Sequence, residues 1–487
     1  MYIIIWKDIY IYDYIFNGNR TYGRGRYFMY KINFEQPVHV HFIGIGGISM
    51  SGLAEILLKE GFAISGSDNK ESALTSHLKQ QGATIFYGQK ASNIIEGIDV
   101  VVYTAAIHED NEEYAQALKK GLPMLSRAEL LGQLMTNYDV PIAISGTHGK
   151  TTTTSMLSHI LLAGEMDPTI SVGGILKAIG GNIKVGKSEL FVTEACEYTN
   201  SFLHFFPKIS VILNIDEDHL DFFKDLDDIR SSFHKFAKLL PKDGTLIING
   251  NIDKLDCITK GLDGRIIKYG DDSSMDYSAT NISHNKLGEA SFDLVKAGVF
   301  VDRISLSVNG DHNVSNALAA IAVSDLLGVS LDKMKKGLKE FTGTNRRFEY
   351  KGEMDGVTII DDYAHHPTEI NATLTAAKYY PHRELWCVFQ PHTYTRTKAL
   401  FHEFVEALAH ADHVVLSDIY AARETDTLGI SSKNIADALK EKGCDAYYFS
   451  SFEDIQDFCV EKCQKGDLLI TMGAGDVVNI GEELLKR

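Results

Sequence analysis

The chain has few cysteines and almost no clustered basic residues, and both absences limit what it can be. Its six cysteines are scattered over 487 residues, and only Cys459 and Cys463 sit one helical turn apart. Neither a disulfide framework nor a four-ligand zinc site is therefore expected, and free thiols indicate a reducing compartment. The formal net charge is −17, and basic residues gather only at Arg20, Arg24 and Arg26, which argues against nucleic-acid binding.

The N-terminus lacks the uninterrupted apolar segment of a signal peptide or membrane span. Residues 1–16 are rich in Ile and Tyr, but Lys7 and Asp13 interrupt them. We therefore expect no membrane insertion and a cytoplasmic location. We also predict that residues 1–28 are a disordered extension and that folding begins near Met29.

The strongest signal is a glycine loop between an apolar run and a helical pattern. Residues 140–144 predict a buried strand and residues 151–162 a helix, with Gly146-Thr-His-Gly-Lys-Thr151 between them. Such a loop points backbone N–H groups and a helix N-terminus at a phosphate. Lys150 adds charge for the β- and γ-phosphates, and Thr151 offers a hydroxyl to Mg²⁺. The loop is shorter than the common G-x-x-x-x-G-K-[ST] pattern, and the alternative is an ordinary strand-to-helix turn.

The length predicts roughly three domains, and the first alternates strand and helix patterns typical of a parallel doubly wound sheet. Its first turn holds Gly44, Gly46 and Gly47, and Asp68 ends the second strand. This resembles a dinucleotide fingerprint, but Ser49 stands where a third glycine is expected. NAD, the diphosphate of another nucleotide, or a turn without ligand all stay open.

Two strands of the central region lead into acidic residues. Residues 190–193 run into Glu194, and residues 211–215 run into an acidic loop that contains His219. The carboxyl ends of strands are where open α/β sheets bind ligands. Glu194 and His219 are therefore candidates for Mg²⁺ beside the phosphates, and a solvated surface loop is the alternative.

Later polar residues are candidates for nucleotide contacts. His312, Asn313 and Asn316 open a helix, where they either cap it or hydrogen-bond a base. Arg346 and Arg347 follow the next helix and are either surface charges or partners of a γ-phosphate.

The last region again alternates strands and helices, and four of its strands lead into polar clusters. The strands are predicted at 357–360, 385–389, 413–416 and 468–472, and the clusters include Asp362, Tyr363, His365, His392, Arg396, Ser417, Asp418 and Asp476. Four clusters at one sheet edge predict a site for a small polar substrate or for the outer side of the nucleotide.

Taken in order, these motifs resemble the Mur ligase family from about residue 37 to the C-terminus. The motifs are Gly44–Ala54, Gly146–Thr152, Glu194–Glu197, Asp218-His219, His312–Asn316, Arg346–Glu349, Asp362–Pro367 and Gln390-Pro-His392 with Arg396. The resemblance implies an α/β fold in three domains. These are an N-terminal Rossmann-like, UDP-sugar-binding domain (29–138), a central P-loop ATPase-type domain (139–344) and a C-terminal Rossmann-like, amino-acid-binding domain (345–487).

The resemblance also implies an ATP-dependent ligase of peptidoglycan synthesis, and hence a role in cell shape and division. ATP would phosphorylate the lactyl carboxylate of UDP-N-acetylmuramate, and the amine of L-alanine would displace the phosphate. Mg²⁺ is the implied cofactor, with Mn²⁺ as the alternative. We expect a monomer or weak homodimer.

The family's functional residues carry over to matching positions. The implied catalytic residues are Lys150, Glu194, His219 and Arg347, and the implied metal ligands are Thr151, Glu194 and His219. The implied ATP contacts are Gly146, Thr147, His148, Gly149, Lys150, Thr151, Thr152, His312, Asn313, Asn316, Arg347 and Asp362. The UDP-sugar would contact Gly44, Gly46, Gly47, Ser49 and Asp68, and the amino acid Tyr363, His365, His392 and Arg396.

One position departs from the family's pattern. Thr393 follows His392 where some members carry arginine, so the amino-acid carboxylate would meet one charge fewer. No carbamylated lysine is assigned, at Lys235, Lys238 or elsewhere.

Four other functions compete with this interpretation. A ligase that adds a tripeptide to the same UDP-sugar needs a larger amino-acid pocket. A folyl-polyglutamate ligase fits poorly because the first nucleotide domain is present. An NAD-dependent dehydrogenase conflicts with the missing third glycine and the separate phosphate loop. A non-catalytic nucleotide-binding protein would not need the His365, His392 and Arg396 clusters.

Overall fold

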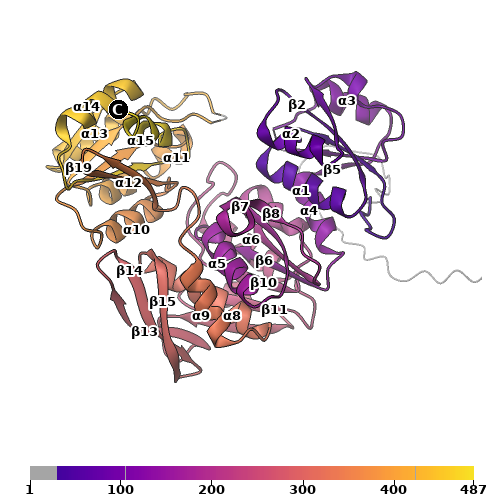
Figure 1. Ribbon diagram of the computed structural model, residues 1–487, viewed down its shortest axis with the longest axis horizontal. Coiled ribbons are helices and arrows are strands. Elements are labelled where there is room, and N and C mark those ends of the chain that lie inside the picture. The colour runs from indigo at the N-terminus through magenta and orange to yellow at the C-terminus, as the bar shows by residue number, and fades with distance from the viewer. Residues whose placement is uncertain (1–29, 105, 423) are drawn as a thin grey trace, which may run out of the picture.

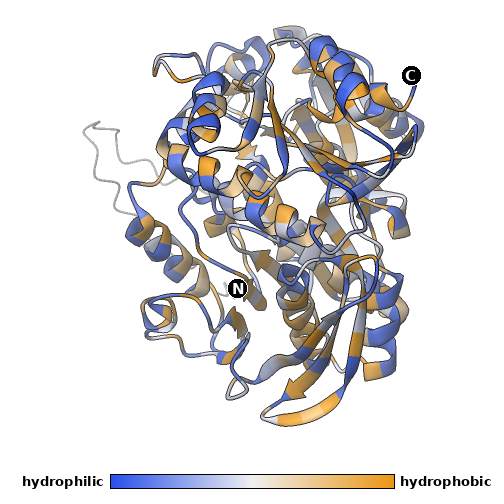
Figure 2. Cartoon of the chain, turned by 90° about the vertical axis from the view of Figure 1, so that its left-hand side faces the viewer, coloured by the Kyte–Doolittle hydropathy of each residue, from blue (hydrophilic) through white to orange (hydrophobic). Residues whose placement is uncertain are grey.

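The computed structural model describes residues 30–104, 106–422 and 424–487, so the prediction for residues 1–28 lies outside the described chain. The protein is α/β and contains three sheets that follow one another along the sequence (Figure 1). Each sheet lies within one of the three predicted domain ranges. Hydrophobic residues lie mainly along the strands and on the sides of helices that cover them (Figure 2).

The N-terminal sheet has five parallel strands in the order β3-β2-β1-β4-β5. Its strands are β1 (His39–Ile43), β2 (Ala63–Asp68), β3 (Thr84–Tyr87), β4 (Val100–Tyr103) and β5 (Met124–Ser126). Its helices are α1 (Ile48–Lys59), α2 (Ala73–Gln80), η1 (Ala91–Asn93), α3 (Glu112–Lys119) and α4 (Arg127–Met135). The order reverses beside β1, so the glycine turn after β1 stands at the switch point where such sheets bind ligands.

The central sheet has ten strands in the order β15-β14-β13-β12-β11-β10-β6-β9-β7-β8. Its strands are β6 (Val140–Ser145), β7 (Thr169–Leu176), β8 (Gly181–Lys184), β9 (Leu190–Ala195), β10 (Ile209–Ile212), β11 (Thr245–Asn249), β12 (Arg265–Gly270), β13 (Tyr277–His284), β14 (Glu289–Lys296) and β15 (Val299–Asn309). Its helices are α5 (Lys150–Ala163), η2 (Lys177–Ile179), η3 (Tyr198–His204), α6 (Leu226–Ala237), α7 (Leu255–Thr259), α8 (His312–Leu326) and α9 (Leu331–Glu340). The phosphate strand β6 lies between β9 and β10 and is parallel to both, which brings their carboxyl ends together.

The C-terminal sheet has six strands in the order β16-β17-β21-β18-β19-β20, all parallel except the β16–β17 pair. Its strands are β16 (Glu349–Met354), β17 (Val357–Asp362), β18 (Leu385–Phe389), β19 (His413–Leu416), β20 (Asp445–Tyr448) and β21 (Leu468–Met472). Its helices are α10 (Pro367–Ala377), α11 (Tyr394–Ala399), α12 (Phe401–Leu408), α13 (Ser432–Glu441), α14 (Phe452–Lys462) and α15 (Val478–Leu484). The four strands predicted to lead into polar clusters are parallel here, so those clusters share one sheet edge.

One predicted strand ends earlier than expected. The apolar run 211–215 predicted a strand to residue 215, but β10 ends at Ile212. Asn214 instead accepts a hydrogen bond from the backbone N–H of His148 (2.7 Å) and donates to its carbonyl (3.0 Å). The chain therefore leaves the sheet to pack against the phosphate loop.

No helix in the described part of the chain is long and apolar enough to cross a membrane.

Candidate active site

The phosphate loop has the backbone conformation that its glycines predict. Gly149 has φ 81° and is the N-cap of α5. A side chain there would also collide with Asn316, whose Oδ1 would lie 2.6 Å from an added Cβ. Asn316 accepts a hydrogen bond from Thr153 of α5 (3.2 Å), so the N-terminus of α8 is attached to the phosphate loop helix. Only glycine satisfies both constraints at position 149.

Lys150 is held inside its own loop. Its Nζ donates to the carbonyls of Gly146 (2.5 Å) and Thr147 (3.1 Å) and to Glu197 Oε2 (3.0 Å). Burial alone would lower the pKa of Lys150, but the carboxylate of Glu197 outweighs it and the pKa is raised. The lysine is therefore a fixed cation beside the position that the loop offers to a phosphate.

Thr151 and Glu194 provide oxygen ligands next to the phosphate loop. The Thr151 hydroxyl donates to Glu194 Oε2 (3.0 Å), and the backbone N–H of Gly173 donates to Oε1 (2.5 Å). Burial raises the pKa of Glu194. A cation would relieve the cost of this buried carboxylate, and a hydroxyl with a carboxylate oxygen is a donor set that suits Mg²⁺.

His219 lies beside Glu197 and Asp218. Its Nε2 is 3.9 Å from Glu197 and 3.7 Å from Asp218, and its ring packs 4.5 Å from that of Tyr198. Burial lowers the pKa of His219, so the ring is neutral at pH 7 and can act as a ligand. Glu197 is therefore a neighbour shared by Lys150 and His219.

A cavity of about 320 Å³ opens from the phosphate loop toward the C-terminal domain. Its lining includes the predicted ATP contacts His148, Gly149, Thr152, His312, Asn313, Asn316, Arg347 and Asp362. Burial lowers the pKa of His312 to about 4, so this ring meets a ligand as a neutral group. The cavity has the size and the mixed polar and apolar lining of a small-ligand site.

The two adjacent arginines have different roles. Arg346 donates to Asp361 (3.0 Å) and to the carbonyls of Gly473 (2.7 Å) and Gly475 (3.1 Å), so it ties the C-terminal sheet together. Arg347 instead lines the cavity of about 320 Å³ and is 4.0 Å from Glu369. Of the pair, only Arg347 lines that cavity.

Asp362 fixes the turn that carries Arg347. Its carboxylate accepts hydrogen bonds from the backbone N–H groups of Phe348 (2.8 Å) and Ala364 (2.7 Å). Burial raises the pKa of Asp362 to about 6. The residue also lines the cavity, so it both positions the turn and forms part of the cavity wall.

A second cavity, of about 190 Å³, lies between the central and C-terminal domains and is lined by His219, Asp218, His392, Thr393 and Arg396. In it, Arg396 donates from Nε (3.0 Å) and Nη2 (2.8 Å) to Asp218 Oδ1. Both side chains are about nine-tenths buried. The guanidinium that was predicted to hold an amino-acid carboxylate therefore already holds a protein carboxylate.

Two other predicted amino-acid contacts, Tyr363 and His365, do not line this cavity, although the His365 ring lies near that of His392, which does. The rings of His365 and His392 lie 5.8 Å apart, and His392 stacks on Tyr420 (5.5 Å). Burial lowers the pKa of His365 to about 4. Tyr363 lies under the guanidinium groups of both arginines at the domain boundary.

The glycine turn of the N-terminal domain is closed by Asp68. The backbone N–H of Gly46 donates to Asp68 Oδ2 (2.8 Å), and a Cβ on Gly46 would lie 2.7 Å from the same oxygen. Asp68 thus shapes the turn directly, whatever it offers to a ribose. Ser49 accepts a hydrogen bond from Arg127 (3.1 Å), which brings a cation to the turn.

Sequence reasoning quoted some site residues without giving them a role. Glu197 and Asp218 lay inside the quoted motifs, Glu197 close to the assigned carboxylate Glu194 and Asp218 next to the assigned His219. Glu369 and Arg127 carried no signal, because each reaches the site only through the tertiary fold.

Comparison with known proteins agrees with this geometry. Three family descriptions match consecutive parts of the chain: "Mur ligase family, catalytic domain" over residues 39–139, "Mur ligase middle domain" over 144–324 and "Mur ligase, glutamate ligase domain" over 346–475. The chain therefore belongs to the Mur ligase family.

Individual relatives within the family are named as particular ligases. The UDP-N-acetylmuramate–L-alanine ligase of Agathobacter rectalis is 61% identical over 459 residues, covering 94% of this chain and 100% of that protein. Among solved structures, the UDP-N-acetylmuramate-alanine ligase of Thermotoga maritima is 30% identical with a TM-score of 0.77, covering 92% of this chain and 99% of the other. A murein peptide ligase from Psychrobacter arcticus is 27% identical with a TM-score of 0.68, covering 92% and 98%.

Proposed function

We propose that this ATP-dependent ligase joins the lactyl carboxylate of UDP-N-acetylmuramate to the amine of L-alanine. The observation that carries the proposal is the 61% identity to a ligase of that name over nearly the whole chain. The site supports it, because a nucleotide cavity and a smaller cavity with a buried arginine lie next to each other between the central and C-terminal domains.

The chemistry follows from the need to activate a carboxylate. A lactyl oxygen attacks the γ-phosphorus of ATP, ADP leaves, and an acyl phosphate forms. The alanine nitrogen then attacks the carbonyl carbon and expels phosphate, which leaves an amide. Lys150 and Arg347 stabilise the charge on the phosphoryl group during the first step.

We further propose Mg²⁺ as the cofactor, with Mn²⁺ as the alternative. Thr151 and Glu194 would hold the ion next to the phosphates, and His219 would serve a second position. When bound, the ion would neutralise negative charge on the phosphates of ATP. Glu194 is supported by its buried carboxylate, whose pKa is raised by burial, because a bound cation would offset the cost of burying its charge.

The tripeptide ligase is the second candidate, because the fold of a murein peptide ligase is also similar. Two observations favour alanine. The identity to the murein peptide ligase is 27%, against 61% to an alanine ligase. The cavity beside Arg396 is about 190 Å³, smaller than the about 300–1,000 Å³ of sites for larger ligands.

One assay separates the two. The protein is incubated with ATP, Mg²⁺ and UDP-N-acetylmuramate, L-alanine or tripeptide is added, and phosphate release is measured. Release that depends on alanine is expected. Release that needs the tripeptide and ignores alanine would refute the proposal. In a parallel reaction that contains NAD, reduction of NAD without phosphate release would also refute it.

We also propose that the enzyme acts in the cytoplasm as a monomer or weak homodimer, without nucleic acid. Its substrates and the net charge of −17 support this. Light scattering across a concentration series tests the oligomeric state, and a stable oligomer at low concentration would contradict it.

A further inference from the structure

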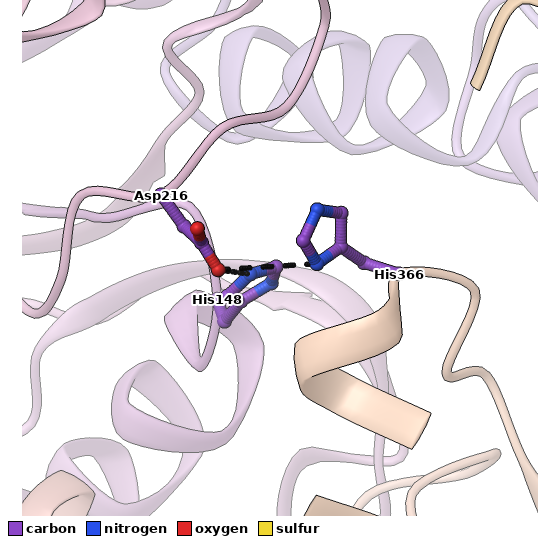
Figure 3. Close-up of side chains that lie close together, drawn as sticks. All are labelled: His148, Asp216 and His366. Carbon is purple, nitrogen blue, oxygen red and sulfur yellow. Dashed lines mark hydrogen bonds and ion pairs between the residues drawn. The ribbon is translucent and has the colours of Figure 1, made fainter. Parts of the chain in front are cut away.

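Two imidazoles and a carboxylate meet where the C-terminal domain contacts the phosphate loop (Figure 3). His148 lies in the phosphate loop, Asp216 follows β10, and His366 is the N-cap of α10. Asp216 Oδ2 is 3.3 Å from His148 Nε2 and 3.9 Å from His366 Nδ1. The three atoms lie within 4.8 Å of one another, and in the described part of the chain no other three His, Cys, Asp or Glu residues do so.

Each of these side chains also has a further partner, for the two histidines at the ring nitrogen that faces away from Asp216 and for Asp216 at the same Oδ2 that faces them. Nδ1 of His148 faces Glu369 Oε1 (3.2 Å), and Nε2 of His366 donates to the carbonyl of Glu217 (2.8 Å). Asp216 Oδ2 accepts from the hydroxyl of Thr368 (2.6 Å). Metal-binding histidines characteristically donate their other ring N–H to a carboxylate or a backbone carbonyl, and ligating carboxylates are themselves hydrogen-bonded.

The carbonyl of Glu217 also sets the tautomer of His366. A carbonyl can only accept, so Nε2 carries the hydrogen and the neutral ring has its lone pair on Nδ1, toward Asp216. Nδ1 accepts a 3.3 Å hydrogen bond from the backbone N–H of Thr368, and the side chain also caps α10 through the backbone of Glu369. A metal ion at Nδ1 would therefore have to replace these capping hydrogen bonds.

We propose that His148, Asp216 and His366 form a transition-metal site that takes Zn²⁺ and joins the central domain to the C-terminal domain. Two imidazole nitrogens and one carboxylate oxygen suit Zn²⁺ better than Mg²⁺, which prefers oxygen. The site thus differs in chemistry from the oxygen ligands of Thr151 and Glu194.

The distances are close to those that zinc needs. Tetrahedral zinc with bonds of about 2.0–2.1 Å places its ligand atoms about 3.4 Å apart. The separations of 3.3 Å and 3.9 Å between Asp216 and the two histidines are near this value. The separation between the two histidine nitrogens is at most 4.8 Å, so it would have to shorten by at most about 1.4 Å. Water fills the fourth position.

Zinc must compete with a proton at this site. Burial alone would lower the pKa of His148, but Asp216 and Glu369 raise it to about 9. The ring is therefore protonated at pH 7, and Zn²⁺ must displace that proton. Zinc affinity consequently rises with pH through the neutral range.

The site joins two domains because its ligands are divided between them. His148 and Asp216 belong to the central domain, and His366 belongs to the C-terminal domain. A bound ion would therefore fasten α10 to the phosphate loop without using the Mg²⁺ ligands.

The test is metal binding by the full-length protein without nucleotide, in millimolar Mg²⁺. Co²⁺ is titrated first, and its visible absorption reports a tetrahedral site with nitrogen ligands. Zn²⁺ is then added as a competitor. We expect one equivalent of Co²⁺ to bind and Zn²⁺ to displace it.

Two variants and a matched control locate the ion. His366→Gln and Asp216→Asn should each weaken Zn²⁺ binding at least about 100-fold. Removing a residue that only hydrogen-bonds a metal ligand costs up to about 100-fold in affinity, and removing the ligand itself should cost at least as much. His413→Gln should bind as the wild type, because His413 also contacts two carboxylates, Asp445 (2.6 Å) and Glu384 (3.1 Å), but belongs to no three-ligand cluster. Circular dichroism confirms that each variant is folded.

Three results would overturn the proposal. The first is no binding of Co²⁺ or Zn²⁺ in millimolar Mg²⁺. The second is binding that both variants retain. The third is release of bound Co²⁺ when more Mg²⁺ is added, since this would place the ion on oxygen ligands. None of these readouts depends on ligase activity, so the proposed function stands or falls separately.

Discussion

Replacing Arg396 tests whether the second cavity holds the amino-acid carboxylate. Charge-assisted hydrogen bonds contribute about 1.5–3 kcal/mol each, so losing one carboxylate contact should raise the KM for alanine roughly 10- to 150-fold. Arg396→Ala should therefore act mainly on the KM for alanine and leave the KM for ATP nearly unchanged. Arg396→Lys keeps the charge but loses the planar guanidinium group. Its KM for alanine should therefore lie between the values of the wild type and of Arg396→Ala. Steady-state phosphate release measures all three enzymes.

Asp218→Asn separates substrate binding from damage to the domain interface. Arg396 and Asp218 form a buried pair, and removing either partner breaks it. If the KM rises only because the interface is broken, Asp218→Asn will raise it equally. If the guanidinium binds the substrate, Asp218→Asn frees it, and the KM for alanine should stay the same or fall. An unchanged KM in Arg396→Ala, or an equal rise in both variants, would refute the assignment.

Three further predictions concern the phosphate loop. Lys150→Ala should abolish phosphate release while calorimetry shows UDP-sugar binding unchanged; normal turnover would contradict the role of the lysine. Gly149→Ala should lose ATP binding and cost about 1–3 kcal/mol of stability, because φ is 81° and Asn316 blocks a Cβ, whereas wild-type binding would show that the loop can rearrange. His148 has its pKa raised from 6.5 to about 9, so its stabilisation is complete below pH 6.5 and is lost as the pH rises through 9. The melting temperature of the wild type should fall more between pH 7 and 10 than that of His148→Gln, and equal slopes would show that His148 does not stabilise the fold.

The architecture was predictable because its signals are local. Apolar runs followed by glycine turns and helical patterns predicted parallel α/β sheets, and the three sheets confirm the α/β class. Strand ends were less predictable. The hydropathy pattern predicted that β10 continues to residue 215. Asn214 instead accepts a hydrogen bond from the backbone N–H of His148, which lies in a loop 66 residues away in the sequence.

The sequence predicted the individual motifs of the site but not the contacts between residues that lie far apart in the chain. The phosphate loop and Glu194 were both expected at the carboxyl ends of strands, which meet at one sheet edge, and the structure places them at the ends of the adjacent strands β6 and β9. The contact of Arg396 with Asp218 joins residues 178 apart on different domains, and no local pattern encodes it. The assigned roles of individual residues stay predictions until the variants are measured.

The loop after β10 is the physical link between the two cavities. Asn214 holds the phosphate loop, Asp216 contacts His148 and Thr368, and Asp218 holds Arg396. Residues that line the first cavity therefore share one short segment with a residue that lines the second. The segment is also held to the C-terminal domain at two of these points, through Thr368 and Arg396. We therefore expect a ligand in one cavity to change binding in the other, and any such coupling is reciprocal because each ligand acts on the same segment.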